Sequence, residues 1–238
     1  MRINLYMPTL LMAGSLTLNC ATTPSSEDSA QPLFDTPGVP QGWTVRAWDD
    51  VSKPGPDGAA WRVDDDGILH GSEPRGTWLV SEREYGDFTL KFEWKLGDRG
   101  NSGCAIRFPL AGDPAFDGLE IQMVDERYND GKDGPDRLTA SIYKAIAADA
   151  QVFKPNDWNA YKITARGDSL TVILNGTVVQ KLDLNRFTNP VVRHDGTLAA
   201  PLKDRPRRGH IGFQELSRGG AHVMIRNARI RMLDEAGM

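Results

Sequence analysis

The sequence of 238 residues is poor in cysteine, in histidine and in long apolar runs, and each shortage excludes a class of protein. Its two cysteines, Cys20 and Cys104, cannot build a disulfide framework or a cysteine-rich zinc site. The four histidines show no spacing typical of metal ligands. No apolar run reaches the roughly 20 residues that a membrane-spanning helix needs. The remaining class is a globular protein without a disulfide framework.

Motifs for nucleotide and nucleic-acid chemistry are missing as well. The sequence contains no glycine-rich phosphate loop and no serine nucleophile elbow. A formal net charge of −4 gives no electrostatic reason to expect nucleic acid as a partner. The acidic loop at residues 125–136 resembles a calcium loop in composition but lacks the ordered ligand spacing of an EF-hand. We predict no cofactor and no metal ligand, and leave a requirement for a divalent metal open.

Residues 1–20 have the features of an export signal. Arg2 gives a short positive region, residues 9–18 form an apolar segment, and Cys20 stands where a lipoprotein signal is cleaved. The usual lipobox has Leu three residues before the Cys and a small residue just before it, where this chain has Thr17 and Asn19. A plain signal peptide cleaved elsewhere therefore stays open. We predict an exported protein of the periplasm or cell envelope, held at the membrane only through a lipid on Cys20.

The next segment, residues 21–31, is rich in Ser, Thr, Pro and acidic residues and has no apolar periodicity. Such a composition predicts a flexible linker. About 200 residues follow, enough for one sizeable domain, which we place at residues 32–233. Cys104 has no partner left for a disulfide, and its place among apolar residues predicts a buried small side chain.

Short β-rich runs divided by Gly, Pro and Asp fill the predicted domain. The strongest alternation of apolar and polar residues lies at residues 87–96. Asn175-Gly176 joins two further runs and is the preferred pair for a type I′ hairpin turn. Residues 140–150 are ambiguous between helix and strand. The other predicted strands lie at residues 43–48, 67–71, 77–81, 158–166, 169–174, 177–182, 209–215 and 221–233. About a dozen strands without long helices predict an all-β fold, a two-sheet sandwich or jelly roll.

Residues 101–124 are the best candidate for an active surface. Two alternating runs in this stretch place Arg107 on one side of a sheet, together with Glu120 and Gln122. Residues 209–215 repeat the pattern, with His210 and Gln214 on the outward side of the strand. If these strands share a sheet, the five side chains and Glu93 form one polar surface suited to a polyhydroxylated ligand. A paired-carboxylate glycosidase would need a second acid near Glu120, and Glu93 is the one obvious candidate.

At this point the chain resembles the bacterial 3-keto-disaccharide hydrolase domains, which have a concanavalin-A-like jelly-roll fold of the lectin and glucanase type. The resemblance covers residues 33–233. It runs through Leu33-Phe34-Asp35, Gly42-Trp43, Asp87-Phe88, Glu93-Trp94, Asn101-Ser102-Gly103, Arg107, Glu120-Ile121-Gln122, Ser141-Ile142-Tyr143, Asp157-Trp158-Asn159, Leu174-Asn175-Gly176, Gly209-His210-Ile211-Gly212-Phe213-Gln214 and Arg226-Asn227. The chain departs from the family pattern at Leu216, where many members have His, and in the elaborated segment 183–208.

The resemblance implies cleavage of glycosides, including di- and oligosaccharides, whose sugar is oxidised to a ketone at carbon 3. A base removes the carbon-2 proton, and the enolate then expels the glycosidic oxygen. Water addition to the eliminated product completes a net hydrolysis. In this interpretation Glu120 is the base or orients the base, and Arg107 with Asn101 stabilises the enolate.

The remaining polar residues are assigned to the substrate under the same resemblance. Gln122, Tyr143 and Gln214 hold sugar hydroxyl groups, with His210 and Glu93 as further binding residues. The alternative is a carbohydrate-binding, lectin-like lipoprotein module without catalysis, because one fold serves both classes. Most tryptophans lie at strand ends or core positions rather than on an exposed aromatic platform, which favours the enzyme.

The tether through Cys20 can be tested by fractionating cells that express the full chain. We expect the wild-type protein with the membranes and the Cys20→Ala variant in the soluble fraction, because the variant cannot be lipidated. A soluble wild-type protein, or a mature N-terminus downstream of Cys20, would contradict this prediction.

Overall fold

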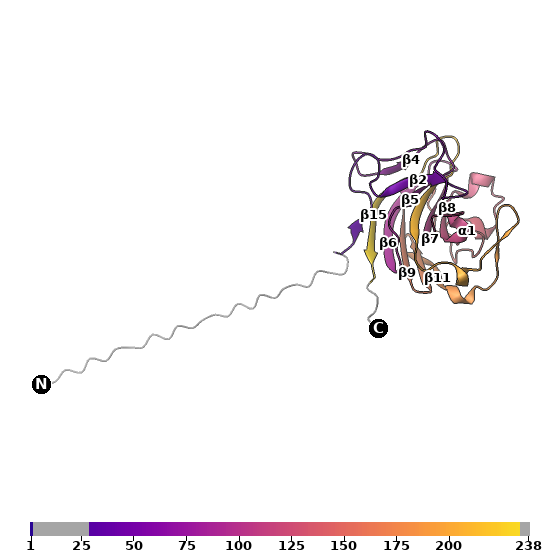
Figure 1. Cartoon of the computed structure of the whole chain (residues 1–238). Helices are drawn as coiled ribbons and strands as arrows, with labels where there is room; N and C mark the ends of the chain where they lie inside the picture. The colour runs from indigo at the N-terminus through magenta and orange to yellow at the C-terminus, as the bar shows by residue number, and fades with distance from the viewer. Residues whose placement is uncertain (2–28, 234–238) are drawn as a thin grey trace.

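The computed structural model describes Met1 and residues 29–233. Cys20, the export signal and most of the predicted linker lie outside these residues. The described chain forms two packed antiparallel sheets with irregular connections and a few short helical turns (Figure 1). The all-β prediction is confirmed. Among the described residues there is no helix with the length and apolar character needed to cross a membrane.

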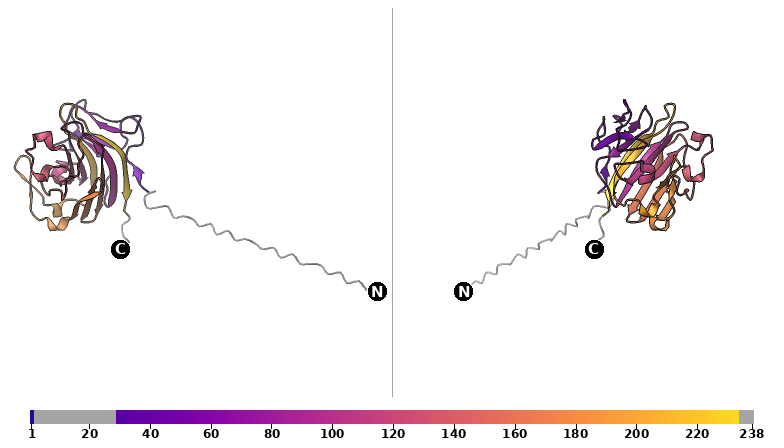
Figure 2. Two further views of the ribbon diagram at one scale, coloured as in Figure 1. Left: turned by 180° about the vertical axis from the view of Figure 1, so that it is seen from behind. Right: turned by 45° about the vertical axis from the view of Figure 1, so that its right-hand side comes forward.

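The larger sheet has eight strands and includes both ends of the domain. Its order is β11-β10-β9-β6-β15-β4-β3, with β1 paired to β15. The strands are β1 (Gln31–Pro32), β3 (Trp61–Val63), β4 (Leu69–Gly71), β6 (Phe88–Lys95), β9 (Asn159–Arg166), β10 (Ser169–Leu174), β11 (Thr177–Asp183) and β15 (Met224–Met232). Both ends of the described domain therefore lie side by side, away from α1 in every view (Figures 1 and 2).

The smaller sheet has five strands in the order β2-β5-β14-β7-β8. They are β2 (Trp43–Ala47), β5 (Thr77–Ser81), β7 (Asn101–Phe108), β8 (Leu119–Val124) and β14 (His210–Glu215). A separate hairpin joins β12 (Val191–Val192) to β13 (Leu198–Ala199). The helical turns are α1 (Pro114–Asp117), η1 (Glu126–Asn129), η2 (Pro135–Arg137), η3 (Leu184–Arg186) and η4 (Leu202–Asp204).

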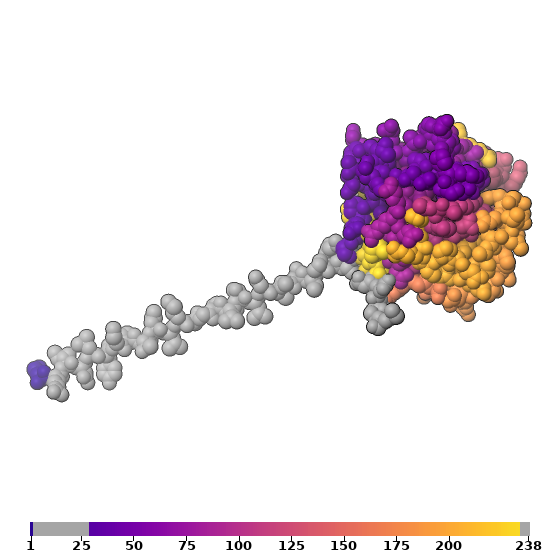
Figure 3. Space-filling model, viewed as in Figure 1, coloured from indigo at the N-terminus to yellow at the C-terminus, as the bar shows by residue number. Residues whose placement is uncertain are grey.

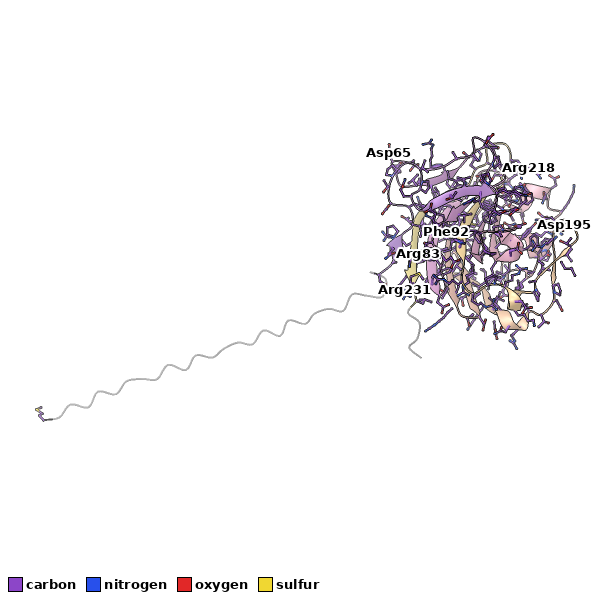
Figure 4. All side chains as sticks on the ribbon, viewed as in Figure 1. Asp65, Arg83, Phe92, Asp195, Arg218 and Arg231 are labelled. Carbon is purple, nitrogen blue, oxygen red and sulfur yellow. The ribbon has the colours of Figure 1, made fainter. Side chains whose placement is uncertain are left out.

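The core lies between the two sheets and explains the alternation in the sequence. In β6 every second side chain, among them Phe92 and Trp94, is buried between the sheets. Phe92 meets Phe213 of β14 edge to face, with ring centroids 5.2 Å apart, and lies in the middle of the molecule (Figure 4). Cys104 is free and fully buried in the same core, as predicted, and burial raises the pKa of its thiol. Aromatic contacts across the two sheets fix their stacking.

Local backbone chemistry accounts for two further features. Asn175 and Gly176 both have positive φ, 51° and 85°, which confirms the predicted type I′ turn between β10 and β11. The ambiguous segment 140–150 contains no helix. Its backbone instead covers the edge of β8, where the Tyr143 N–H donates to the Glu120 carbonyl at 3.0 Å. This hydrogen bond places Tyr143 beside β8, the edge strand of the smaller sheet.

A β-bulge in β7 overturns the expected position of Arg107. Phe108 pairs with His210 and Ile106 with Ile211, so Arg107 has no partner residue across the strand pair and adopts φ 56°. The extra residue shifts the alternation by one position. Phe108 therefore packs on the face where Arg107 was expected, and the prediction that Arg107 shares that face with Glu120 and Gln122 is wrong.

The guanidinium of Arg107 instead joins three segments of backbone. It donates to the carbonyl of Gly86 at 2.9 Å and to that of Gly167 at 2.8 Å, and pairs with Asp87 at 2.8 Å. The side chain is fully buried. A buried arginine with all its partners in place ties the end of β7 to the start of β6 and to the turn between β9 and β10.

We expect Arg107→Met to destabilise the fold by about 3 kcal/mol, since it leaves Asp87 and two carbonyl groups without their donor. Denaturant unfolding followed by circular dichroism measures this change. Arg166→Met, at an exposed arginine on the end of β9, is the matched control and should change the free energy of unfolding by less than about 0.5 kcal/mol. Equal unfolding midpoints for the two variants would contradict the structural role of Arg107.

Candidate functional site

The face of the smaller sheet that points away from the core is divided into two halves. One half is closed by an apolar cluster of Val51, Trp78, Val80, Ala105 and Phe108. The other half carries polar side chains and forms the floor of a cavity of about 420 Å³. The floor residues are Asn101, Glu120, Gln122 and Gln214. Three neighbouring strands, β7, β8 and β14, therefore supply one polar floor.

Strand register places the Glu120 carboxyl group over a glycine. Glu120 lies opposite Ala105, and Gln122 lies opposite Gly103. A Cβ placed on Gly103 would lie 2.0 Å from a carboxylate oxygen of Glu120. The carboxyl group thus lies directly over the backbone of Gly103, and any larger residue there would force the Glu120 side chain to move.

The Glu120 carboxyl group is buried without a partner. Its residue is 2% exposed, and within residues 29–233 no hydrogen bond or ion pair reaches its carboxylate oxygens. Burial raises the pKa of Glu120 well above its ordinary value, and the negative charge of Asp113 raises it further. A carboxylate held in this way is a stronger base than one in water, because nothing but a proton or a ligand compensates its charge.

Asp113 is a second buried carboxyl in the lining of the same cavity. It is the N-cap of α1 and accepts a hydrogen bond from the Ala115 N–H at 3.0 Å. Burial raises its pKa to about 7, with a further contribution from Asp117. The two carboxyl groups, Asp113 and Glu120, are close enough to influence each other's protonation.

One wall of the cavity is formed by aromatic rings from distant parts of the chain. Tyr143 and His194 both line it, with ring centroids 5.7 Å apart. His194 comes from the turn between β12 and β13 and also meets Phe116 at 5.2 Å and Trp48 at 5.9 Å. Burial lowers the pKa of His194, and the charges of Lys144 and Arg137 lower it further. The imidazole is therefore neutral at physiological pH and serves as a hydrogen-bonding group.

Three arginines, Arg75, Arg137 and Arg218, also line the cavity. Arg75 is engaged with the Leu216 carbonyl at 2.9 Å and the Tyr128 hydroxyl at 2.8 Å, and Arg218 lies over the Tyr128 ring at 4.4 Å. Arg137 has only a distant ion pair, 3.9 Å from Asp133. Arg137 and Arg218 therefore keep more donor capacity for an anionic group in the cavity than Arg75 does.

Five of the predicted site residues are brought together in this cavity. These are Asn101, Glu120, Gln122, Tyr143 and Gln214. Gln122 already accepts a hydrogen bond from the Met123 N–H at 2.9 Å, whereas the buried side-chain oxygen of Asn101 has no partner among the described residues. An orphaned acceptor in the lining is a ready partner for a ligand hydroxyl.

Three predicted site residues lie elsewhere. Arg107 is buried behind the sheet for the reason given above. His210 is held at the far end of β14, with its Nδ1 2.8 Å from the Ser81 carbonyl oxygen, and does not line the cavity. Glu93 lies in β6 of the larger sheet and pairs with Arg226 at 2.7 Å. The expectation that all three join Glu120 on one surface is wrong.

Several other lining residues were not predicted from the sequence, among them Asp113, Arg137 and His194. Asp113 precedes Pro114, a pair that signals a helix start, and attention to that signal could have placed a carboxyl beside the strand of Glu120. Arg137 ends the short helical turn η2, and His194 lies in the turn between β12 and β13, so neither belongs to a periodic pattern. Figure 4 labels Asp195, next to His194 in the hairpin turn, at the edge of the molecule nearest α1. Within the described residues, no three His, Cys, Asp or Glu side chains gather as a metal site.

Comparison with known proteins shows which family the chain belongs to. A structure titled "Putative glycosyl hydrolase" from Parabacteroides distasonis is 26% identical, has a TM-score of 0.69, and aligns over 86% of this chain and 99% of its own. A second protein from the same organism, also titled "putative glycosyl hydrolase", is 20% identical, with a TM-score of 0.64 over 90% of this chain and 99% of its own.

A laminarinase from Rhodothermus marinus shares the fold at 13% identity, with a TM-score of 0.50 over 85% of this chain and 97% of its own. These likenesses confirm the jelly-roll prediction. No curated protein matches the chain. A family model described as the 3-keto-alpha-glucoside-1,2-lyase-like domain matches residues 29–231. The chain therefore belongs to the 3-keto-alpha-glucoside-1,2-lyase-like domain family.

Proposed function

We propose that this protein cleaves glycosides whose sugar ring carries a ketone at carbon 3, with Glu120 as the base. The observation that carries the proposal is the buried, unpartnered carboxyl group of Glu120 on the floor of a polar cavity. Family membership and the glycosyl-hydrolase titles of similar structures support a carbohydrate-active enzyme. The oxidised substrate and the order of bond changes are our inference from the chemistry of the site.

The reaction needs one base and a group that stabilises negative charge. The carbon-3 ketone makes the neighbouring carbon-2 proton acidic, and the Glu120 carboxylate removes that proton to leave an enolate. The enolate electron pair then forms the carbon-1 to carbon-2 double bond as the bond from carbon 1 to the glycosidic oxygen breaks. The leaving oxygen takes a proton. Water adds across the new double bond, with its hydroxyl on carbon 1 and a proton on carbon 2, and this completes a net hydrolysis.

Arg137 takes the role that the sequence assigned to Arg107. Its guanidinium makes one ion pair among the described residues, 3.9 Å from Asp133, and its charge acts on the side chains of Tyr143 and His194. A cation near a developing enolate lowers the barrier because it stabilises charge that is absent in the ground state. Asn101, Gln122 and Gln214 hold sugar hydroxyl groups, and the Tyr143 ring closes one side. These roles match the amide and hydroxyl chemistry of the lining.

The experiment that tests this function compares one disaccharide with its 3-keto form. We expect the keto form to be cleaved and the parent sugar to remain intact, because without the carbonyl the carbon-2 proton is too weakly acidic for a carboxylate. In heavy water the released sugar should carry deuterium at carbon 2. Glu120→Gln should reduce kcat/KM for the keto form by roughly 10²–10⁴-fold.

Each alternative to this chemistry gives a different result in the same assay. Binding of the parent sugar with cleavage of neither compound would indicate a lectin-like module. Cleavage of the parent sugar would indicate an ordinary glycosidase with paired acids. Product without deuterium at carbon 2 would rule out elimination followed by water addition.

The pH profile tests the link between the two buried carboxyl groups. Proton abstraction needs ionised Glu120, so kcat/KM should rise with pH through a midpoint above the ordinary range of a glutamate. Asp113→Asn keeps a side chain that can cap α1 but removes a negative charge that raises the pKa of Glu120. The midpoint of the acidic limb should therefore move to lower pH.

The control for this shift is Asp65→Asn, which removes an exposed carboxylate on the opposite side of the view from Asp195 (Figure 4). Its profile should match that of the wild type. A midpoint that stays in place or moves to higher pH in Asp113→Asn would contradict the coupling of the two carboxyl groups.

A further inference from the structure

A second cavity of about 490 Å³ lies next to the first. Arg137 lines both cavities. The wall between them is a small apolar cluster that includes Phe116 and Val191, against which Tyr143 and Ala145 pack. Tyr143 lines the first cavity, whereas Ala145 and Val191 line the second. The two spaces are thus neighbours that share one cation and one wall.

The β12–β13 hairpin takes part in both spaces. Its first strand lines the second cavity through Val191 and Val192, and its turn carries His194 into the first. In the space-filling view the segment around residues 180–210, coloured orange, covers the right-hand side of the molecule (Figure 3). A molecule with one end in the first cavity could therefore extend into the second beside this hairpin.

Positive charge exceeds negative charge in the second cavity. Its lining includes Arg137, Lys144 and Arg186, against a single acid, Asp136. Lys144 donates one hydrogen bond, to the Arg193 carbonyl at 3.1 Å. Arg186 has no hydrogen bond or ion pair to any residue in the range 29–233. An unpaired guanidinium beside an ammonium group is a favourable place for a carboxylate.

Beyond these charged residues the lining is mixed, with the polar Thr188 and Asn189 beside an apolar group that includes Phe187, Val191 and Leu202. Leu202 and Val191 are buried, and the Phe187 ring is half-buried against the main core. Apolar floors with a few convergent charged groups bind flat, partly hydrophobic molecules and fix their orientation through the charge. The excess of cations favours a carboxylate, and Phe187 and Leu202 offer apolar surface to an aromatic ring that carries it.

We propose that the second cavity binds the leaving group of the substrate and selects aglycones that consist of an aromatic ring with a carboxylate. The proposal rests on the function proposed above, since it assumes that the oxidised sugar occupies the first cavity. Arg186 and Lys144 bind the carboxylate, Phe187 and Leu202 contact the ring, and Arg137 lies where the two parts of the substrate meet.

The test compares the 3-keto-glucosides of 4-hydroxybenzoate and 4-hydroxybenzamide, which differ in charge but hardly in size. Wild-type protein should prefer the carboxylate with a kcat/KM ratio of about tenfold or more, the usual effect of a hydrogen bond to a charged group. Arg186→Gln should reduce that ratio toward one. Arg166→Gln, at an exposed arginine outside both cavities, should leave the ratio unchanged. A ratio near one in the wild type, or one that Arg186→Gln does not reduce, would overturn the proposal.

A binding measurement separates this proposal from the proposed function. The unoxidised glucosides of the same two phenols are titrated into the protein by calorimetry. Tighter binding of the carboxylate that depends on Arg186, without cleavage of either 3-keto compound, would support the second cavity and reject the proposed reaction. Cleavage and binding of both compounds to equal extents would support the reaction and reject the second cavity as a carboxylate site.

Discussion

Glu120 lies over Gly103 in a space that would not accommodate one additional carbon atom. The strand pairing of β7 and β8 fixes this contact, because the two residues lie two positions apart in register and so share one face of the sheet. Burial of a carboxyl group without a partner costs free energy, which the rest of the sandwich must supply through the core between its two sheets. Such a destabilising arrangement is typical of a functional site rather than of a structural one.

The fold could be predicted from the sequence because its strands are long enough to show their periodicity. The alternation in β6 and the Asn175-Gly176 turn are local signals, and both agree with the structure. Of the strands with two or three residues, β4 was predicted, whereas β1, β3 and β12 leave no such signal and were not. Pairing partners are a tertiary property, and no local pattern determines them.

Less of the candidate site than of the fold could be predicted from local sequence patterns. Glu120, Gln122 and Gln214 could be placed on one face because β7, β8 and β14 keep regular alternation in this region. The position of Arg107 could not be predicted, because a bulge of one residue moves the following side chains to the other face of the sheet. Nothing in the sequence marks that bulge. The cavity is completed by residues from the connections between strands, among them Arg137 and His194. Their positions depend on packing across the whole domain.

The pairing of β1 with β15 has a consequence for how the domain is presented. Gln31 lies opposite Ile230, so the chain enters and leaves the domain at one point of the larger sheet. That point is on the side of the molecule away from α1, whereas Asp113 and Ala115 at the start of α1 line the cavity (Figures 1 and 2). In a domain attached to a surface through its N-terminal segment, the cavity would thus lie away from the point of attachment.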